Sequence, residues 1–399
     1  MELVPLPPHS LRIGQVLTFS VRDAEGKLLF AAGQTLQSTP QVQALIQRGA
    51  WVLAHETKEY QKALVHKMDT LMMQGASLAN IVKVEADFRA ERSPRAVAEL
   101  SEPAFWTDLH LHAHSLLKDP REDFLGRLET LREEALQRFR QRPDAVLTLL
   151  VHDASQDFQR YSARHAVLCL LVADLVARQL GWAPEGTQAL HNAALTMNLS
   201  TMLLQDRLAA QEDKLSERQR LELHDHGDRS AQLLRQLGVQ DELWLGAVRL
   251  HHEAGPGALA GRVAVAQLAR VLRRIDIFGA RLSPRRTRKA LSGAAAVRAI
   301  YLDELQQPDE AGAAVIKAVG LYPPGSLVRL ANGEQGIVVR RGHSATEPLV
   351  AALMGKSGSP LSGPVPRDTR LQTQAVAASL APHELKLVIN MEKLLKTAG

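Results

Sequence analysis

Paired histidines at the end of an apolar, helix-like segment constrain the fold of this chain more than any other feature. His251-His252-Glu253 close a segment that carries Leu243, Leu245, Val248 and Leu250. Side-chain packing alone does not readily account for two adjacent imidazoles in such a segment. Imidazoles and carboxylates together are common ligands of divalent transition metals in proteins.

Three further polar residues stand in comparable segments. His165 and His226 lie upstream of the pair, and Asp276 lies in the next segment downstream. Four histidines and one aspartate on four successive helices are typical of a metal site in the core of a helical bundle. The sequence therefore predicts that these five side chains converge.

These residues resemble the HD-GYP family, the cyclic di-GMP phosphodiesterase branch of the HD phosphohydrolases, from about Phe158 to about Gly336. His165 matches the family's first ligand histidine, His226 its His-Pro-x-x-Gly helix, and His251-His252-Glu253 its His-His-Glu motif. Asp276 matches the Asp-x-Phe-x-Ala segment. The resemblance implies metal ligands at His165, His226, His251, His252 and Asp276. It also implies phosphate contacts from Arg285 and Arg288, because arginine forks fit phosphate oxygens in a bidentate geometry.

The chain departs from the family at two motifs. Thr196 and Met197 stand where the resemblance places the His-Asp doublet, and Ala254-Gly-Pro-Gly257 replaces the Gly-Tyr-Pro loop. In the family the doublet's aspartate bridges two metals, so its loss is expected to abolish a binuclear centre. Water without both metals keeps too high a pKa to attack a phosphodiester efficiently at pH 7. The sequence thus leaves open whether the chain is an enzyme, and favours inactivity.

Composition sets the broad class of protein. With 399 residues, two or three domains are expected, and 45% hydrophobic with 23% charged residues is ordinary for a globular chain. One cysteine, Cys169, suits a reducing cytoplasm and is expected to be a buried apolar residue. The start of the chain lacks signal-peptide features, and no long apolar run predicts a membrane span. The net charge of +5 is too small to indicate nucleic-acid binding.

The expected fold is mainly α: an HD-type helical bundle with a small N-terminal β-containing module and a short C-terminal β element. Four regions are predicted: a β-containing module at 1–58, a helical linker region at 59–143, the HD-GYP-like domain at 144–320 and a C-terminal β extension, loop and terminal helix at 321–399. The predicted helices after the linker region are 144–153, 161–180, 187–208, 216–237, 241–253, 260–278, the 283–301 region, 309–319 and 382–395. A hairpin is expected around Asn332-Gly333, and residues 355–370 are expected to form a loop.

Each candidate residue also has a structural interpretation. The histidines could be inherited residues with a packing role, and Asp276 could form surface ion pairs with Arg273 or Arg274. The arginines of 281–289 could form a solvated face. Three other patterns are expected to lie off the site, or on solvated helix faces: His224, His191-Asn192, and His110 with His112 and His114.

Two function classes follow. In the first, the chain is a degenerate HD-GYP-like sensor or adaptor in cyclic di-GMP signalling that does not hydrolyse the dinucleotide. In the second, it is an active metal-dependent cyclic di-GMP phosphodiesterase with a reduced ligand set. The cofactor is expected to be one divalent ion, iron or manganese, or none. Cyclic di-GMP, signalling proteins and a second copy of the chain are the partners considered, in a bacterial cytoplasm.

Overall fold

The computed structural model describes residues 3–6, 17, 20–31, 34, 43, 45, 49–53, 101–120, 123–156, 158–385 and 387–397. The chain forms two compact units, Met1–Ser115 and Leu116–Gly399. Helices dominate the described residues, with a small sheet near each end of the chain, so the predicted mainly α fold is confirmed. Within the described residues, no helix is both long enough and apolar enough to cross a membrane.

The first unit contains a four-stranded antiparallel sheet in the order β1-β4-β2-β3. Its strands are β1 (Leu3–Pro5), β2 (Val21–Arg22), β3 (Leu28–Phe30) and β4 (Trp51–Leu53). The helix α5 (Glu102–Lys118) begins in this unit, and its Asp108 forms a buried ion pair with Arg22 on β2. Part of the module predicted at 1–58, and residues 59–100 of the linker region predicted at 59–143, lie outside the described residues.

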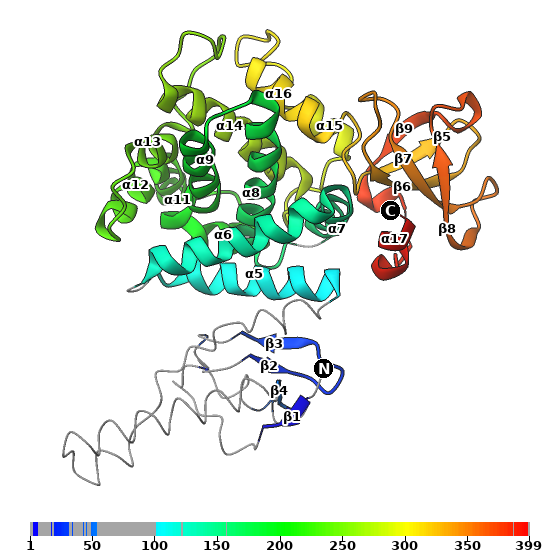
Figure 1. The fold of residues 1–399 in the computed structure, drawn as a ribbon, viewed down its shortest axis with the longest axis horizontal. Helices are drawn as coiled ribbons and strands as arrows, with labels where there is room; N and C mark the ends of the chain where they lie inside the picture. The colour runs from blue at the N-terminus through cyan, green and yellow to red at the C-terminus, as the bar shows by residue number, and fades with distance from the viewer. Residues whose placement is uncertain are drawn as a thin grey trace. The chain divides into compact units, whose positions relative to one another are not determined.

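The helices of the second unit's bundle precede its C-terminal sheet in the chain (Figure 1). They are α6 (Phe124–Gln141), α7 (Pro143–Gln156), α8 (Tyr161–Leu180), α9 (Pro184–Thr196), the 3-10 turn Leu199–Thr201, α10 (Met202–Ala210), α11 (Glu217–His224), α12 (His226–Gln236), α13 (Glu242–Leu250), α14 (Ala264–Leu282), α15 (Gly293–Arg298) and α16 (Glu310–Val319).

The central helix of this unit is α8, which packs against α9, α10, α14 and α16. Its side chains are buried almost along its full length, from Tyr161 to Ala177, as its continuous apolar sequence predicts. The helix ends at Gly181, which takes the left-handed conformation with φ 66° that favours glycine. Because α8 carries His165 in its first turns, the most buried helix of the bundle supplies one side chain of the candidate site.

Three of the predicted helices are not continuous in the structure. The segment 187–208 is interrupted at Met197–Thr201, between α9 and α10. The segment 216–237 is divided at Asp225, although its predicted capping box at Ser216 and Gln219 is confirmed. Residues 283–292 do not form a helix, because Pro284 lacks an N–H and Arg285 and Arg288 instead exchange backbone hydrogen bonds across a tight turn.

The C-terminal sheet of the second unit has five antiparallel strands in the order β8-β7-β6-β5-β9. Its strands are β5 (Leu327–Leu330), β6 (Gln335–Arg340), β7 (Leu349–Met354), β8 (Pro360–Asp368) and β9 (Val376–Leu380), and the short helix α17 (Met391–Thr397) packs beside it (Figure 1).

The hairpin predicted around Asn332-Gly333 is confirmed. The loop predicted at 355–370 is wrong over most of its length, because pairing with β7 holds this proline-containing segment as the edge strand β8. The helix predicted at 382–395 is also wrong before Met391.

Candidate metal centre

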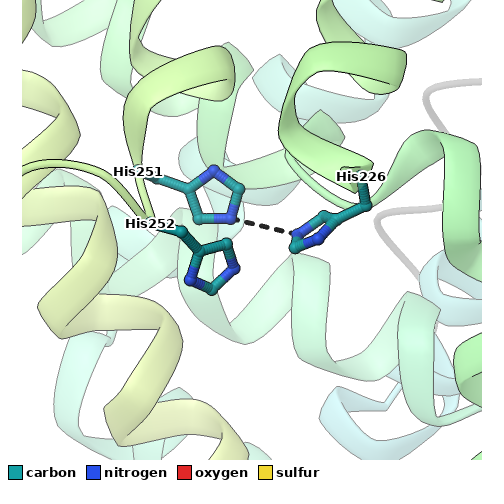
Figure 2. Close-up of side chains that lie close together, drawn as sticks. All are labelled: His226, His251 and His252. Atoms are coloured by element: carbon teal, nitrogen blue, oxygen red, sulfur yellow. Dashed lines mark hydrogen bonds between the residues drawn. The ribbon is translucent and has the colours of Figure 1, made fainter. Parts of the chain in front are cut away.

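Three histidines on neighbouring helices point at one another. His226 is the first residue of α12, while His251 and His252 directly follow α13 (Figure 2). One ligand atom from each of the three lies within 4.8 Å of the other two. His226 and His251 are buried, whereas His252 is exposed. The cluster is therefore reachable from solvent on the His252 side.

The hydrogen bonds of the two buried rings fix which nitrogen faces inward. Nδ1 of His226 lies 2.5 Å from the carbonyl oxygen of Leu223, and Nδ1 of His251 lies 2.6 Å from that of Val248. A carbonyl oxygen only accepts, so both Nδ1 atoms must carry the proton. The Nε2 atoms, which face each other at 3.2 Å, then both present lone pairs. Two facing lone pairs repel unless a cation or a shared proton lies between them.

Burial and neighbouring charges favour the neutral form of His251 and His252. The pKa of His251 is lowered to about 3, mainly by burial and also by the neighbouring His252, while Asp276 opposes the shift. Burial also lowers the pKa of His252, against the opposing charge of Asp276. Both imidazoles are therefore neutral at pH 7. Neutral imidazole, oriented by a hydrogen bond from its other nitrogen, is the usual metal ligand.

The remaining two predicted ligands form a pair of their own. Nε2 of His165 on α8 lies 2.8 Å from Oδ1 of Asp276 on α14. Burial alone would lower the pKa of His165, but Cys169, Tyr161 and Asp276 together raise it well above its ordinary value. The pKa of Asp276 is held below its ordinary value, because His165, His251 and His252 outweigh the effect of burial. Asp276 therefore contacts His165 directly and interacts electrostatically with His251 and His252.

Two glycines allow the helices to approach this closely. A Cβ at Gly227 would lie 2.7 Å from the carbonyl oxygen of Arg249, so this glycine lets α12 reach the end of α13. A Cβ at Gly279 would lie 3.0 Å from Nδ1 of His165. At both glycines the backbone lies directly against an element that carries a candidate histidine. A larger residue at either position would push that element away.

The two residues that the resemblance places at the doublet are packed and internally bonded. Thr196 is fully buried at the end of α9, where its hydroxyl donates to the carbonyl of Asn192 at 2.7 Å. The same oxygen accepts the indole N–H of Trp244 on α13 at 2.8 Å. Met197 is 1% exposed and has an apolar side chain. Neither residue offers a ligand in the manner of a histidine or a carboxylate.

The two predicted phosphate-binding arginines lie in the turn after α14. The guanidinium of Arg285 lies over the ring of Tyr161, 5.3 Å from its centroid, and that ring stacks on His165. Arg288 donates to the carbonyl oxygens of Ala280 and Ser283 at the end of α14. The Nε atoms of both arginines are buried and make no hydrogen bond with the described residues. Arg285 is thus the better placed of the two to meet a ligand at the histidines.

The structural interpretations are settled for several other residues. Arg273 and Arg274 pair with Glu304 and Asp309, and Asp276 pairs with His165 instead of with either arginine. His224 is exposed, as predicted.

For the two other histidine patterns, the prediction for His191 agrees with the structure and the prediction for His110 does not. His191 lies 3.5 Å from Asp174, so it belongs to a different polar contact from the candidate site. His110 is 8% exposed, so the prediction of a solvated face is wrong at that position.

Three residues beside the candidate ligands had no functional prediction. Trp244 bonds to Thr196, Tyr161 stacks on His165, and Cys169 places its sulfur 3.5 Å from Nε2 of His165. Cys169 is buried, as predicted, and burial raises its pKa. Its place one helical turn after His165 is a signal in the sequence that it shares the face of that histidine.

The fold and the site together define a helical-bundle protein with a histidine-rich candidate metal centre. Among known proteins, the chain is 28% identical over 213 residues to a cyclic di-GMP phosphodiesterase of Pseudomonas aeruginosa. The aligned region is 52% of this chain and spans about half (51%) of that protein's length. No family model matches the chain, and no solved structure matches it. The similarity supports a relationship to cyclic di-GMP phosphodiesterases.

Proposed function

We propose that this chain is a degenerate HD-GYP-like signalling protein that acts in cyclic di-GMP signalling as a sensor or adaptor without hydrolysing the dinucleotide. The relative from Pseudomonas aeruginosa supports the link to this dinucleotide. The observation that carries the loss of hydrolysis is the pair Thr196 and Met197, which are buried where the family resemblance requires a histidine and an aspartate. The helical domain at 144–320 is assigned this role.

Without the histidine and the aspartate at these positions, the site is expected not to activate water for attack on the phosphodiester. Two ions sharing a hydroxide lower the pKa of bound water enough for attack on a phosphodiester at neutral pH. The carboxylate of Asp276 is bonded to His165, and the hydroxyl of Thr196 is bonded to Trp244. Such an arrangement leaves no bridging carboxylate from α9. A bound divalent ion would polarise a phosphate oxygen and hold the ligand in place.

Ligand recognition in this proposal comes from the arginines beside the histidines. Arg285 presents its guanidinium above Tyr161, which stacks on His165, and Arg288 lies in the same turn. Guanidinium groups bind phosphate oxygens through charge-assisted hydrogen bonds worth about 1.5–3 kcal/mol each before desolvation. A dinucleotide with two phosphates suits a site that combines these arginines with the histidines. The protein is expected to work in a bacterial cytoplasm, which suits a chain with a single cysteine.

The alternative function is an active phosphodiesterase that uses a reduced ligand set. The three-histidine cluster of His226, His251 and His252 favours it, because one ion on three histidines still generates an activated water in some enzymes. In this case the carboxylate of the His165–Asp276 pair would lie beside the ion and balance part of its charge.

One experiment separates the two functions. Purified protein is incubated with cyclic di-GMP in the presence of Mn²⁺, Fe²⁺ or Zn²⁺, and the products are separated by chromatography. The expected result is no sustained turnover. Turnover that disappears in His251→Ala would establish the alternative and reject the non-hydrolytic proposal.

Binding is measured separately by calorimetry. Wild-type protein is expected to bind cyclic di-GMP, and Arg285→Ala/Arg288→Ala is expected to weaken binding by at least roughly tenfold, the loss of one charge-assisted bond. Arg281→Ala/Arg286→Ala is the matched control, since it removes the same charge from the same run while Arg286 pairs with Glu212. Equal loss in both double variants would show that only net charge matters, and no heat from wild type would reject the sensor role in favour of a protein–protein adaptor.

A further inference from the structure

We infer that the groove between α6 and the start of α9 binds a small anion, a phosphate ester or a carboxylate, through Arg132, Arg140 and His191. The groove has a volume of about 660 Å³. Small-molecule sites in proteins have volumes of roughly 300–1,000 Å³. Its lining includes none of the candidate metal ligands and neither Arg285 nor Arg288. The inference therefore goes beyond the proposed function and assigns a second ligand site.

A buried imidazole with an unused nitrogen lines the floor of the groove. His191 is 3% exposed, and its Nε2 makes no hydrogen bond with the described residues, although Oδ1 of Asp174 lies 3.5 Å away. Buried polar atoms are nearly always hydrogen-bonded in proteins, so an orphaned nitrogen on a residue that lines a cavity favours a role in binding. Burial lowers the pKa of His191 to about 4, so the ring is neutral at pH 7 and donates one hydrogen bond.

Two arginines on α6 supply the positive charge of the groove. Arg132 is 8% exposed, and its guanidinium donates to Oδ1 of Asn192 at 2.9 Å and to Glu129 at 3.2 Å. Arg140 donates to the buried carboxylate of Asp174 at 2.6 Å. A guanidinium carries five N–H donors, so each arginine keeps donors for a ligand after these bonds. Because the bonds also hold both groups in place, an anion meets donors that are already oriented.

The rim of the groove adds neutral hydrogen-bonding groups and one carboxylate. Four neutral polar side chains line it: Gln137, Gln141, Thr187 and Gln188. Thr187 lies in the first turn of α9, where the positive end of the helix dipole favours an anion. The carboxylate of Glu133, 3.8 Å from Nη2 of Arg132, opposes an anion. Such a lining fits a ligand that has several oxygen atoms besides its negative charge, such as a sugar phosphate or a hydroxy acid.

Calorimetry on chelator-treated, full-length protein tests the inference with glucose 6-phosphate, citrate and uncharged glucose at constant ionic strength. At least one of the two anions is expected to bind at one site per chain, and glucose is expected not to bind. The anion that binds more tightly identifies a phosphate ester or a carboxylate as the ligand group. The same affinity is expected in Arg285→Ala/Arg288→Ala, because these arginines lie outside the groove. Loss of binding in that double variant would place the anion at the other site and overturn the inference.

Two substitutions in the groove locate the bound anion. Arg140→Gln removes one cation while Arg178 still pairs with Asp174, and it is expected to weaken binding by roughly tenfold, the loss of one charge-assisted bond. Gln188→Glu adds a negative charge at the exposed rim with little risk to folding, and it is expected to weaken binding by at least roughly fivefold. Gln372→Glu is the matched control, since it adds the same charge at an exposed position in the turn before β9.

The sign of one further substitution identifies the charge of the ligand. Glu133→Gln removes the opposing carboxylate and is expected to strengthen anion binding by roughly twofold or more. Weaker binding in Glu133→Gln, equal losses in Gln188→Glu and Gln372→Glu, or no binding of either anion by wild type at millimolar concentration would overturn the inference. The titrations contain no dinucleotide, so these outcomes leave the proposed function to its own assays.

Discussion

Trp244 donates its indole N–H to the hydroxyl oxygen of Thr196 at 2.8 Å, and this contact joins α13 to α9. Thr196 is fully buried, so the hydroxyl has no access to water in place of the indole. The contact thus links the helix that ends at His251 to the position where the family resemblance expects a metal-binding doublet.

The Trp244–Thr196 contact is expected to contribute measurably to stability. Trp244→Phe keeps the aromatic bulk and removes the N–H, and it is expected to cost about 1–3 kcal/mol because a buried hydroxyl loses its donor. Thr196→Val is expected to cost a similar amount, because the indole N–H is then unsatisfied. The double variant should cost less than the sum of the two, as in any pair of residues in direct contact. Urea unfolding of all four proteins measures this cycle, and strict additivity would show that the contact contributes nothing.

Gly227 and Gly279 are expected to be intolerant of alanine. The new methyl group at Gly227 would meet the Arg249 carbonyl, and the one at Gly279 would meet the His165 ring. Each alanine is expected to destabilise the protein by about 1–3 kcal/mol through overpacking, and to lower Zn²⁺ affinity at Gly227 by moving His226. Gly186→Ala in α9 is the control, because its methyl group would meet nothing within 4 Å and alanine favours helix. Thermal unfolding and metal titration test all three, and an unaffected Gly227→Ala would mean that α12 moves freely against α13.

The His165–Asp276 pair is expected to stabilise the metal-free protein most at mildly acidic pH. The pKa of His165 is raised in the folded state, so its contribution is complete below its ordinary value of 6.5 and is lost as pH rises through the raised value. The pKa of Asp276 is lowered, so its contribution is present above its ordinary value of 3.8 and is lost on acidification. Asp276→Asn should therefore lower the free energy of unfolding by about 1.5–3 kcal/mol near pH 5.5, as the loss of other hydrogen bonds to charged groups does. The cost should be smaller near pH 9, and chelator-treated protein unfolded in urea at both values checks the sign.

Two histidines outside the candidate site, the buried His191 and the partly buried His152, are expected to make the protein less stable in acid. Burial lowers the pKa of His152 and of His191 to about 4. The unfolded chain therefore binds more protons than the folded chain between pH 6.5 and 4, and stability falls as pH decreases through this window. Each residue is expected to contribute on the order of 1–3 kcal/mol of this loss. His191→Gln should flatten the pH dependence of thermal unfolding between 6.5 and 4.5. The exposed His343→Gln should leave it unchanged, and a parallel slope in both variants would contradict the prediction.

In the C-terminal sheet, Glu334 and Arg367 join the β5–β6 turn to β8 through two hydrogen bonds of 2.6 and 2.7 Å. The bond with Arg367 lowers the pKa of Glu334 to about 2. The pair's contribution is thus present above pH 4.5 and is lost as pH falls towards 2. Glu334→Gln is expected to cost about 1–3 kcal/mol at pH 7. Asp368→Asn, which breaks an exposed contact with Arg370, should change stability little. Equal effects of the two substitutions would show that burial of Glu334 is unimportant.

Much of the helical bundle is predictable from the sequence because its signals are local. The helix at 161–180 is recovered to the residue from its apolar run and from Gly181, and the capping box at Ser216 identifies the start of α11. The breaks at Met197–Thr201 and at Asp225 are not predictable in this way, since packing between helices decides them. The strand β8 is hidden for the same reason: its glycines and prolines favour a loop, and only pairing with β7 overrides that preference.

The internal arrangement of the candidate site is not predictable from the sequence. Motif spacing predicts that His165, His226, His251, His252 and Asp276 converge, and the structure brings the first and last of these into one pair and the other three into one cluster. Their division into a three-histidine cluster and a separate pair depends on side-chain distances that no spacing encodes. The place of Trp244 is also invisible to the sequence, because a tryptophan on an apolar helix face most simply indicates packing.

The three clustered histidines come from the consecutive helices α12 and α13, whereas His165 and Asp276 are 111 positions apart in the chain. Short loops close at a lower entropic cost and form sooner than long ones. We therefore expect the cluster to assemble earlier during folding than the pair. Zinc added to the unfolded chain should accordingly accelerate refolding, with a rate that depends on the metal concentration, and the Asp276→Asn substitution should mainly accelerate unfolding.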